Sequence, residues 1–324
     1  MDSRRRFQEC MRYGAPDRAP LLEEPIREET VAWWRKQGLP AHLNPCDNSA
    51  LDRHEVIEPD LEPRPELEVC PSSRAELRDF CRYMDPQDDG RLPDDWAAKM
   101  PEWRSSGRIL MLRVQRGFFL SMGVDGWDRF TDVVRLLVDD PLFVSEMMEL
   151  QGEFSARLAE RILSSQEVDA AIFVEPIGGD HGPLISPRMY EEFVLKSYDR
   201  IMNVLRRHGI ETIIFRTFAN VRPLLPALLR HGFNCLWACE VRSGAMDYRV
   251  LRREFGRDLR LIGGIDLDVL RAGKEAIMRE VCEKVPPLLA DGGYAPVANG
   301  RIREDVPYAS YAFYRELLQE VAGG

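Results

Sequence analysis

The feature that most constrains the fold is an alternation of short apolar strands with helices from residue 108 onwards. The clearest repeat begins with residues 168–174, an apolar run with β-branched residues that predicts a buried strand. A helix over residues 187–208 follows, from a serine N-cap and a proline to a terminal glycine. A second strand, residues 211–215, comes directly after it. This order predicts two parallel strands joined by a covering helix.

The same alternation occurs at least six times along the chain. Eight repeats in about this length favour a closed barrel over an open sheet, and no glycine-rich nucleotide motif is present. We therefore predict one α/β domain over residues 1–324, a single (β/α)8 TIM barrel with an irregular N-terminal insertion. The expected strands are 108–114, 168–174, 211–215, 233–238, 259–263 and 293–297, and the expected helices are 127–138, 141–164, 187–208, 221–231, 247–255, 273–290 and 307–321.

The N-terminal third has a weaker pattern. We expect helices at residues 3–13 and 27–37 and a short strand at residues 19–22 that ends in two glutamates. Residues 40–106 are rich in proline and acidic residues. A structureless loop of that length would be unusual, so this segment is expected to contain short strands near 56–57 and 67–69 and a helix at 73–83.

Composition excludes several classes of partner. The formal net charge is −10, which argues against nucleic acid as the main partner. No apolar run reaches the length of a membrane span and no signal peptide pattern opens the chain, so a cytoplasmic protein without a membrane partner is expected. The 7 cysteines are scattered and odd in number, as expected of reduced thiols. Cys235 and Cys239, which could share one side of a strand with Glu240, are expected to be core thiols rather than metal ligands.

Collinear motifs lie at residues 16–20, 182–193, 214–226, 261–266 and 292–296. Together they resemble the uroporphyrinogen decarboxylase superfamily. The chain is more similar to the corrinoid-dependent methyltransferase-like branch, because the arginine- and glycine-rich N-terminal motif of the true decarboxylases is missing. The resemblance implies a barrel with its pocket at the carboxyl ends of the strands, methyl transfer between a small methylated compound and a corrinoid (cobalamin) protein, and a homodimer.

One departure from the family pattern concerns zinc. Zinc-dependent methyltransferases of this superfamily carry a His-x-Cys-Gly-Asn-type motif after the fifth strand, where this chain has Arg216 and Phe218 at the two ligand positions. A guanidinium and a phenyl ring cannot bind Zn²⁺. We therefore expect no metal and no tightly bound cofactor, only a corrinoid presented by a partner protein.

Arginines follow several predicted strands. Arg113, Arg116, Arg216 and Arg301 would meet at one edge of a barrel. Guanidinium groups bind carboxylate and phosphate bidentately, so converging arginines predict a small anionic substrate. For each arginine alone, a surface ion pair is an equal alternative, except for Arg216, which directly follows a buried strand.

Acid–base candidates follow the strand at residues 168–174. An imidazole has an ordinary pKa near ~6.5, so His181 is the best general acid or base, and Glu175 and Asp180 are close enough in sequence to orient it. His181 could equally cap the loop that follows. Further polar residues at strand ends are expected to contact the substrate: Asn220, Glu240, Asp266 and Asn299.

Three functions remain open at this level. The first is methyl transfer to a corrinoid protein, the second is decarboxylation of an anionic substrate, and the third is a ligand-binding barrel that has lost catalysis. A corrinoid partner would need an exposed apolar rim. Residues that could form the rim, although residues of these types are more often in the core, are Phe118, Phe119, Leu120, Met122 and Phe218.

Overall fold

The structure of the chain is a computed structural model that describes residues 1–45, 50–67, 70–242 and 244–323. By their internal contacts these residues form two compact units. Unit 1 consists of residues 1–54, 107–109 and 235–324, and unit 2 of residues 55–106 and 110–234.

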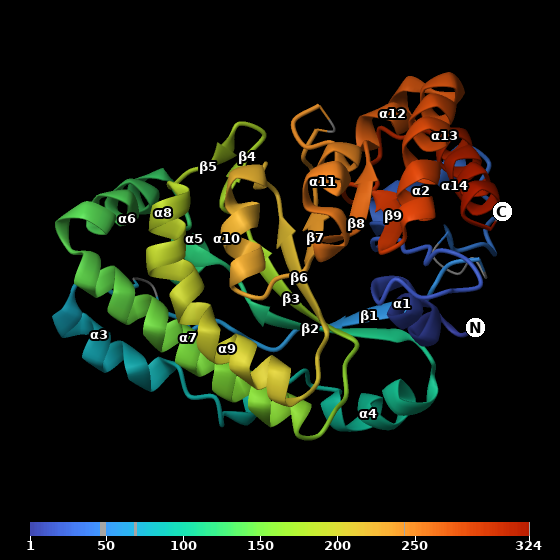
Figure 1. Cartoon of the computed structure of the whole chain (residues 1–324). Helices are drawn as coiled ribbons and strands as arrows, with labels where there is room; N and C mark the ends of the chain where they lie inside the picture. The colour runs from blue at the N-terminus through green and yellow to red at the C-terminus, as the bar shows by residue number, and fades with distance from the viewer. Residues whose placement is uncertain (46–49, 68–69, 243, 324) are drawn as a thin grey trace. The chain divides into compact units, whose positions relative to one another are not determined.

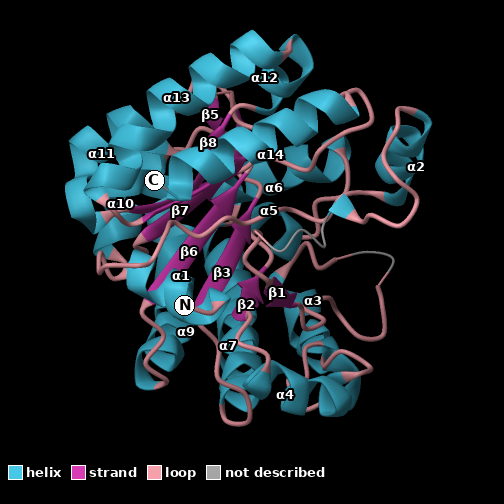
Figure 2. Cartoon of the chain, turned by 90° about the vertical axis from the view of Figure 1, so that its right-hand side faces the viewer, coloured by secondary structure: helices cyan, strands magenta, loops and turns pink. Residues whose placement is uncertain are grey.

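Unit 2 is built on parallel strands. β2 (Ile109–Gln115) pairs with β3 (Ala170–Glu175), and β3 pairs with β6 (Thr212–Thr217), both in parallel. β1 (His54–Ile57) stands next to β2 in the strand order. The three central strands lie side by side in Figure 2. The strand–helix–strand repeat expected over residues 168–215 is thus confirmed.

Aromatic side chains fill the space between these strands and their helices. The rings of Phe173 and Phe233 meet edge to face with centroids 4.8 Å apart, and Phe215 packs on Phe233 at 5.3 Å. Tyr198 contacts Phe173 at 5.1 Å. Edge-to-face contacts of this kind add to the stability gained by burial. In Figure 1 the covering helices α7 and α9 run side by side.

The helices of unit 2 are α3 (Arg74–Phe80), α4 (Trp96–Ser105), α5 (Phe118–Ser121), α6 (Trp127–Asp139), α7 (Pro141–Leu163), α8 (Pro187–Met189), α9 (Lys196–Arg207) and α10 (Leu225–Arg230). Short 3₁₀ turns occupy Cys81–Tyr83, Asp89–Arg91 and Arg222–Leu224. The helix expected over 187–208 is interrupted by one π-helical segment, Tyr190–Leu195, between α8 and α9. Before it, β4 (Gly178–Gly179) and β5 (Gly182–Pro183) form a small antiparallel hairpin that the sequence did not predict.

Unit 1 also contains parallel strands. β7 (Cys235–Ala238) pairs with β8 (Arg260–Ile265), and β8 with β9 (Tyr294–Ala298). Its helices are α1 (Ser3–Met11), α2 (Glu28–Lys36), α11 (Tyr248–Phe255), α12 (Leu267–Ala272), α13 (Lys274–Asp291) and α14 (Tyr308–Gly323), with a 3₁₀ turn at Gly256–Asp258. α13 and α14 pack along each other.

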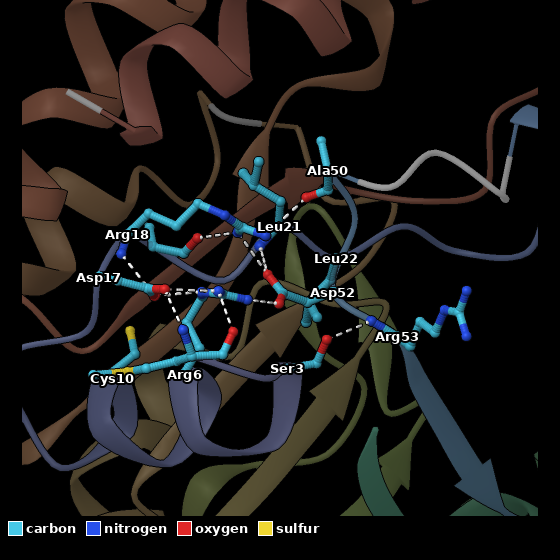
Figure 3. Close-up of polar contacts among 12 residues, drawn as sticks. Ser3, Arg6, Cys10, Asp17, Arg18, Leu21, Leu22, Ala50, Asp52 and Arg53 are labelled. Atoms are coloured by element: carbon cyan, nitrogen blue, oxygen red, sulfur yellow. Dashed lines mark hydrogen bonds and ion pairs between the residues drawn. The ribbon is translucent and has the colours of Figure 1, made fainter. Parts of the chain in front are cut away.

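A buried charge network holds the N-terminal segment of unit 1 (Figure 3). The Asp52 carboxylate has no exposed surface and accepts hydrogen bonds from Arg6, from Arg18 at 2.7 Å and from the backbone N–H of Leu21 at 2.8 Å. Arg6 also donates to Asp17 at 2.6 Å and 2.9 Å. Every carboxylate oxygen of Asp52 is therefore engaged, which is what a buried charge requires.

This network replaces one expected element. The segment 19–22, predicted as a strand, makes no ladder among the described residues, because Leu21 and Asp52 exchange hydrogen bonds instead. The irregular region 40–106 contains β1 and α3 as expected, and in addition α4. Of the strand expected near 67–69, residues 68–69 lie outside the described residues.

The α/β class with parallel strands and many helices is confirmed, whereas the closed barrel and the single domain stay predictions. No helix within the described residues is long and apolar enough to cross a membrane.

Candidate functional site

Two arginines share one face of the strands in unit 2. Arg216 on β6 pairs with Val174 on β3, and Arg113 on β2 pairs with Ile172. Alternate residues of a strand face the same side, so both guanidinium groups belong to the face of Ile172 and Val174. Both residues are half-buried. Burial and the neighbouring charge of Arg216 lower the pKa of Arg113, so two like charges converge on this face.

Arg116 joins the same face through a bulge. The register moves from Arg113 opposite Ile172 to Gln115 opposite Phe173, so β2 contains one extra residue. Gln115 therefore faces the other side of the sheet, and the next residue, Arg116, faces the same side as Arg113. Arg116 is buried, donates to the carbonyl of Leu120, and burial lowers its pKa to about 10. It is therefore still charged at neutral pH.

Arg113, in β2, and Arg116, directly after it, are balanced by glutamates from one segment. Arg116 forms an ion pair with Glu62, and Arg113 lies 3.7 Å from Glu58. Both glutamates follow β1 in the irregular region, and the sequence alone did not single them out. The side chain of Glu58 is 63% exposed and that of Glu62 is 60% exposed, although Arg113 and Arg116 are largely buried.

Glu175 lies on the opposite, helix-covered face. It alternates with Val174 at the end of β3 and is fully buried. Its Oε1 accepts from the N–H of Phe118 at 2.9 Å, and its Oε2 accepts from Tyr190 at 2.9 Å and Tyr198 at 3.1 Å. Burial raises its pKa to about 7 in spite of these three donors. Glu175 is thus held among helices, away from the face of Arg113 and Arg216.

The Glu175 contact fixes the turn that carries Arg116. Gly117 precedes the N–H that Glu175 accepts and has φ of +98°, a region that favours glycine. A Cβ at this position would lie 2.7 Å from the carbonyl oxygen of Val174 and 2.8 Å from Oε1 of Glu175. The backbone therefore approaches β3 too closely for any other residue, and Glu175 acts on Arg116 through the backbone.

Asp180 and His181 form the turn of the β4–β5 hairpin. Asp180 is half-exposed and His181 is exposed. The hairpin is tied to the end of β6 by a hydrogen bond of 2.9 Å from the N–H of Asn220 to the carbonyl of Gly179. The Asn220 side chain accepts from the N–H of Arg222 at 3.3 Å. Asn220 thus positions the hairpin, and the catalytic roles of His181, Asp180 and Glu175 stay predictions.

The remaining predicted residues belong to unit 1 and follow its strands. Asn299 is buried, and its side chain donates to the carbonyl of Val241 at 2.6 Å and accepts from the N–H of Leu267 at 2.9 Å. Asp266 caps α12. Glu240 is exposed and lies 3.2 Å from Arg303. These contacts make Asn299 and Asp266 structural supports of the loops after β7, β8 and β9.

Two adjacent buried glutamates lie beside Arg301. The Nε of Arg301, an exposed residue, is 4.0 Å from Glu24. Glu23 accepts from Tyr311 at 3.1 Å and lies 3.4 Å from Arg315. Burial raises the pKa of Glu23. Glu23 and Glu24 are the two glutamates that follow the segment 19–22 in the sequence.

Sequence reasoning also missed Tyr190 and Tyr198. They are about two helical turns apart, so they occupy one face of the helix that follows β3. That spacing, read together with a glutamate at the strand end, could have identified the cluster. Nothing in the sequence could have identified Glu58 and Glu62, because the segment around them has no periodic pattern.

The residues at the end of β6 do not fit the zinc ion of the methyltransferases that the sequence resembles. Arg216 and Phe218 occupy its ligand positions, and neither can bind Zn²⁺. Across the described ranges, no three His, Cys, Asp or Glu side chains gather closely enough to hold a metal. Cys235 and Cys239 are buried, and burial raises the pKa of the Cys235 thiol.

The expected apolar rim is mostly core. Phe118, Phe119 and Met122 are buried, which is the more common position for residues of these types and rules them out as an exposed rim. They pack inward because the turn held by Glu175 directs α5 toward α7. Leu120 and Phe218 are the exposed members, at 37% and 36%.

Comparison with protein families agrees with the motifs found in the sequence. The model of the family described as Uroporphyrinogen decarboxylase (URO-D) matches residues 121–293, a little over half of the chain. No curated protein sequence matches the chain. The matched residues include β3, β6, β7 and β8 with their strand ends. The chain therefore belongs to the uroporphyrinogen decarboxylase family.

Proposed function

We propose that this protein is a uroporphyrinogen decarboxylase-like barrel enzyme that moves a methyl group from a small anionic substrate to a corrinoid protein. The observation that carries the proposal is the convergence of Arg113 and Arg216 on one face of β2 and β6. Two half-buried guanidinium groups on one face can bind one anionic ligand together, because guanidinium binds carboxylate and phosphate bidentately.

In the proposed reaction the bond between the methyl carbon and its leaving group breaks. A corrinoid presented by a partner protein would supply the electron pair for the new bond to the methyl carbon. The leaving group keeps the bonding electrons and takes up a proton. We assign that proton to His181, which is exposed at the turn of the β4–β5 hairpin next to the end of β6. Arg113 and Arg216 hold the anionic group, and Arg116 adds a third positive charge.

The partner protein would dock close to these groups. Leu120, whose carbonyl accepts from Arg116, and Phe218, which follows Arg216 closely, are exposed apolar side chains near the arginines in sequence and structure. A location in the cytoplasm and a homodimer remain part of the proposal.

Decarboxylation is the second candidate, favoured by the number of arginines on one face. Arg113, Arg116 and Arg216 could hold a substrate with several carboxylates. In that reaction the bond to the carboxyl carbon breaks, CO₂ leaves, and the electron pair left on carbon takes a proton from His181. The description of the matching family names a decarboxylase, which supports this candidate.

One experiment separates the candidates. The protein is incubated with methylated anionic compounds and free cob(I)alamin, and with carboxylated compounds alone. Methylation of the cobalamin supports methyl transfer, CO₂ release supports decarboxylation, and thermal stabilisation by a ligand without either product supports a binding protein. Arg216→Ala should abolish whichever signal is seen, whereas Arg188→Ala, an exposed arginine at the start of α8, should not.

A further inference from the structure

Two exposed glutamates reach two largely buried arginines in unit 2. Glu62 pairs with Arg116, whose side chain is 5% exposed. Glu58 lies 3.7 Å from Arg113, whose side chain is 27% exposed. Each arginine also has an Nε atom that is buried and makes no hydrogen bond. The guanidinium groups are therefore incompletely satisfied by the chain itself, and each has one exposed carboxylate beside it.

The segment that carries the glutamates is fixed by its backbone. Arg91, which is 1% exposed, donates to the carbonyl of Glu62, to that of Tyr83 at 2.7 Å and to that of Asp85 at 3.1 Å. The N–H of Asp60 donates to the carbonyl of Arg91 at 2.8 Å. Because the buried guanidinium of Arg91 donates to these backbone carbonyls, it holds residues 58–66 in place.

The side chains of the glutamates are less constrained than this backbone. Glu58 and Glu62 alternate with buried Pro59, Leu61 and Pro63, so the segment is anchored on one side and presents carboxylates on the other. A glutamate that is more than half exposed can turn into water by rotating its own side chain. Displacing it from an arginine therefore does not require the segment to move.

We propose that Glu58 and Glu62 are specificity-determining residues, which occupy the anion positions at Arg113 and Arg116 until a substrate with two anionic groups displaces both. The inference rests on the proposed function, since it assumes that the face of Arg113 and Arg216 binds the substrate. A carboxylate of the chain and a carboxylate of the substrate compete for the same guanidinium N–H groups.

This competition selects the charge of the ligand. A ligand with one carboxylate replaces one glutamate and leaves the other ion pair intact. A ligand with two carboxylates at a suitable spacing replaces both glutamates. Its two groups then bind Arg113 in β2 and Arg116 directly after β2. The preferred substrate is therefore a compact dianion rather than a monoanion.

The test compares Glu58→Gln, Glu62→Gln and the double variant with the wild-type protein. Glu66→Gln is the matched control, because Glu66 is an exposed residue of the same segment and makes no ion pair in the part of the chain that the structure describes. Binding of acetate, malonate, succinate, glutarate and inorganic phosphate is measured by calorimetry at constant ionic strength. Thermal unfolding confirms that each variant is folded.

Each of the two substitutions should tighten binding of at least one dicarboxylate by about two- to fivefold, the range expected for loss of one exposed competing ion pair. For a dicarboxylate, the two gains in affinity should multiply in the double variant. Acetate should gain affinity from only one of the substitutions. Glu66→Gln should bind every ligand as the wild type does.

Equal affinities of wild type and variants, an equal gain for Glu66→Gln, or no binding of any dianion would overturn the inference. Tighter binding without turnover in any assay would refute the proposed function and leave the inference intact. Turnover that requires Arg216 but does not change in the Glu58 and Glu62 variants would support the proposed function and refute the inference.

Discussion

Replacing Glu175 by glutamine should change how the stability of the protein depends on pH. The ordinary pKa of a glutamate here is 4.5, and burial raises that of Glu175 to about 7. A carboxyl whose pKa is higher in the folded state binds its proton more tightly there, so it stabilises the fold while protonated. That stabilisation is complete below pH 4.5 and is lost as the pH rises through 7.

The size of the effect follows from the two pKa values. Each tenfold change in proton affinity is worth about 1.4 kcal/mol. The rise from 4.5 to about 7 then corresponds to about 3 kcal/mol of unfolding free energy, lost by the wild type over that pH range. Glutamine cannot ionise, and its amide can still accept from the N–H of Phe118. The unfolding free energy of Glu175→Gln, minus that of the wild type, should therefore increase by about 3 kcal/mol between pH 4.5 and pH 8.

Urea unfolding at pH 5, 6, 7 and 8 measures this difference directly. Glu192→Gln is the control, because Glu192 is an exposed residue in the same π-helical segment, and its difference from the wild type should not follow the curve of Glu175→Gln. A difference between Glu175→Gln and wild type that stays constant over the whole range would refute the claim that burial dominates the titration of Glu175.

Three further predictions concern binding and stability. Arg216→Ala should weaken binding of an anionic ligand by about 10- to 100-fold in calorimetry, as loss of a charge-assisted pair predicts, and an unchanged affinity would remove Arg216 from the site. Asp52→Asn should lower the free energy of unfolding by about 3 kcal/mol, because Arg6 and Arg18 lose their buried counter-charge, and an unchanged melting temperature would contradict this. Gly117→Ala should cost about 1–3 kcal/mol of stability and also weaken anion binding through Arg116, and a variant as stable as wild type would show that the turn can relax.

The order of elements could be predicted from the sequence because strands and helices differ in length and period. The strands expected near residues 168, 211 and 259 and the helices between them agree with the structure to within a few residues at their ends. The missed elements have other causes. α4 contains Pro101 and lies in a segment rich in acidic residues, and the β4–β5 hairpin is too short for any periodicity to be seen.

The candidate site was predictable in residue type but not in orientation. Arg113 and Arg216 were expected at strand ends, and they lie on β2 and β6, which both pair with β3. Glu175 was expected to orient His181. Its side chain faces the helices instead, because it is one residue beyond Val174 and therefore on the other side of β3. The partners Glu58 and Glu62 come from a segment whose position depends on the buried Arg91, and no local pattern encodes that contact.

The extra residue in β2 has a consequence for how related chains should be aligned. A related chain that lacks one residue between Arg113 and Arg116 would form an unbroken ladder and would still place its second arginine on the face of Arg113. A chain of the same length without the bulge would instead direct that arginine into the helical layer, and a neutral amide would take its place. An alignment that opens a one-residue gap at this strand tip therefore compares groups that meet the same ligand, whereas an ungapped alignment of a bulged strand with a regular one does not.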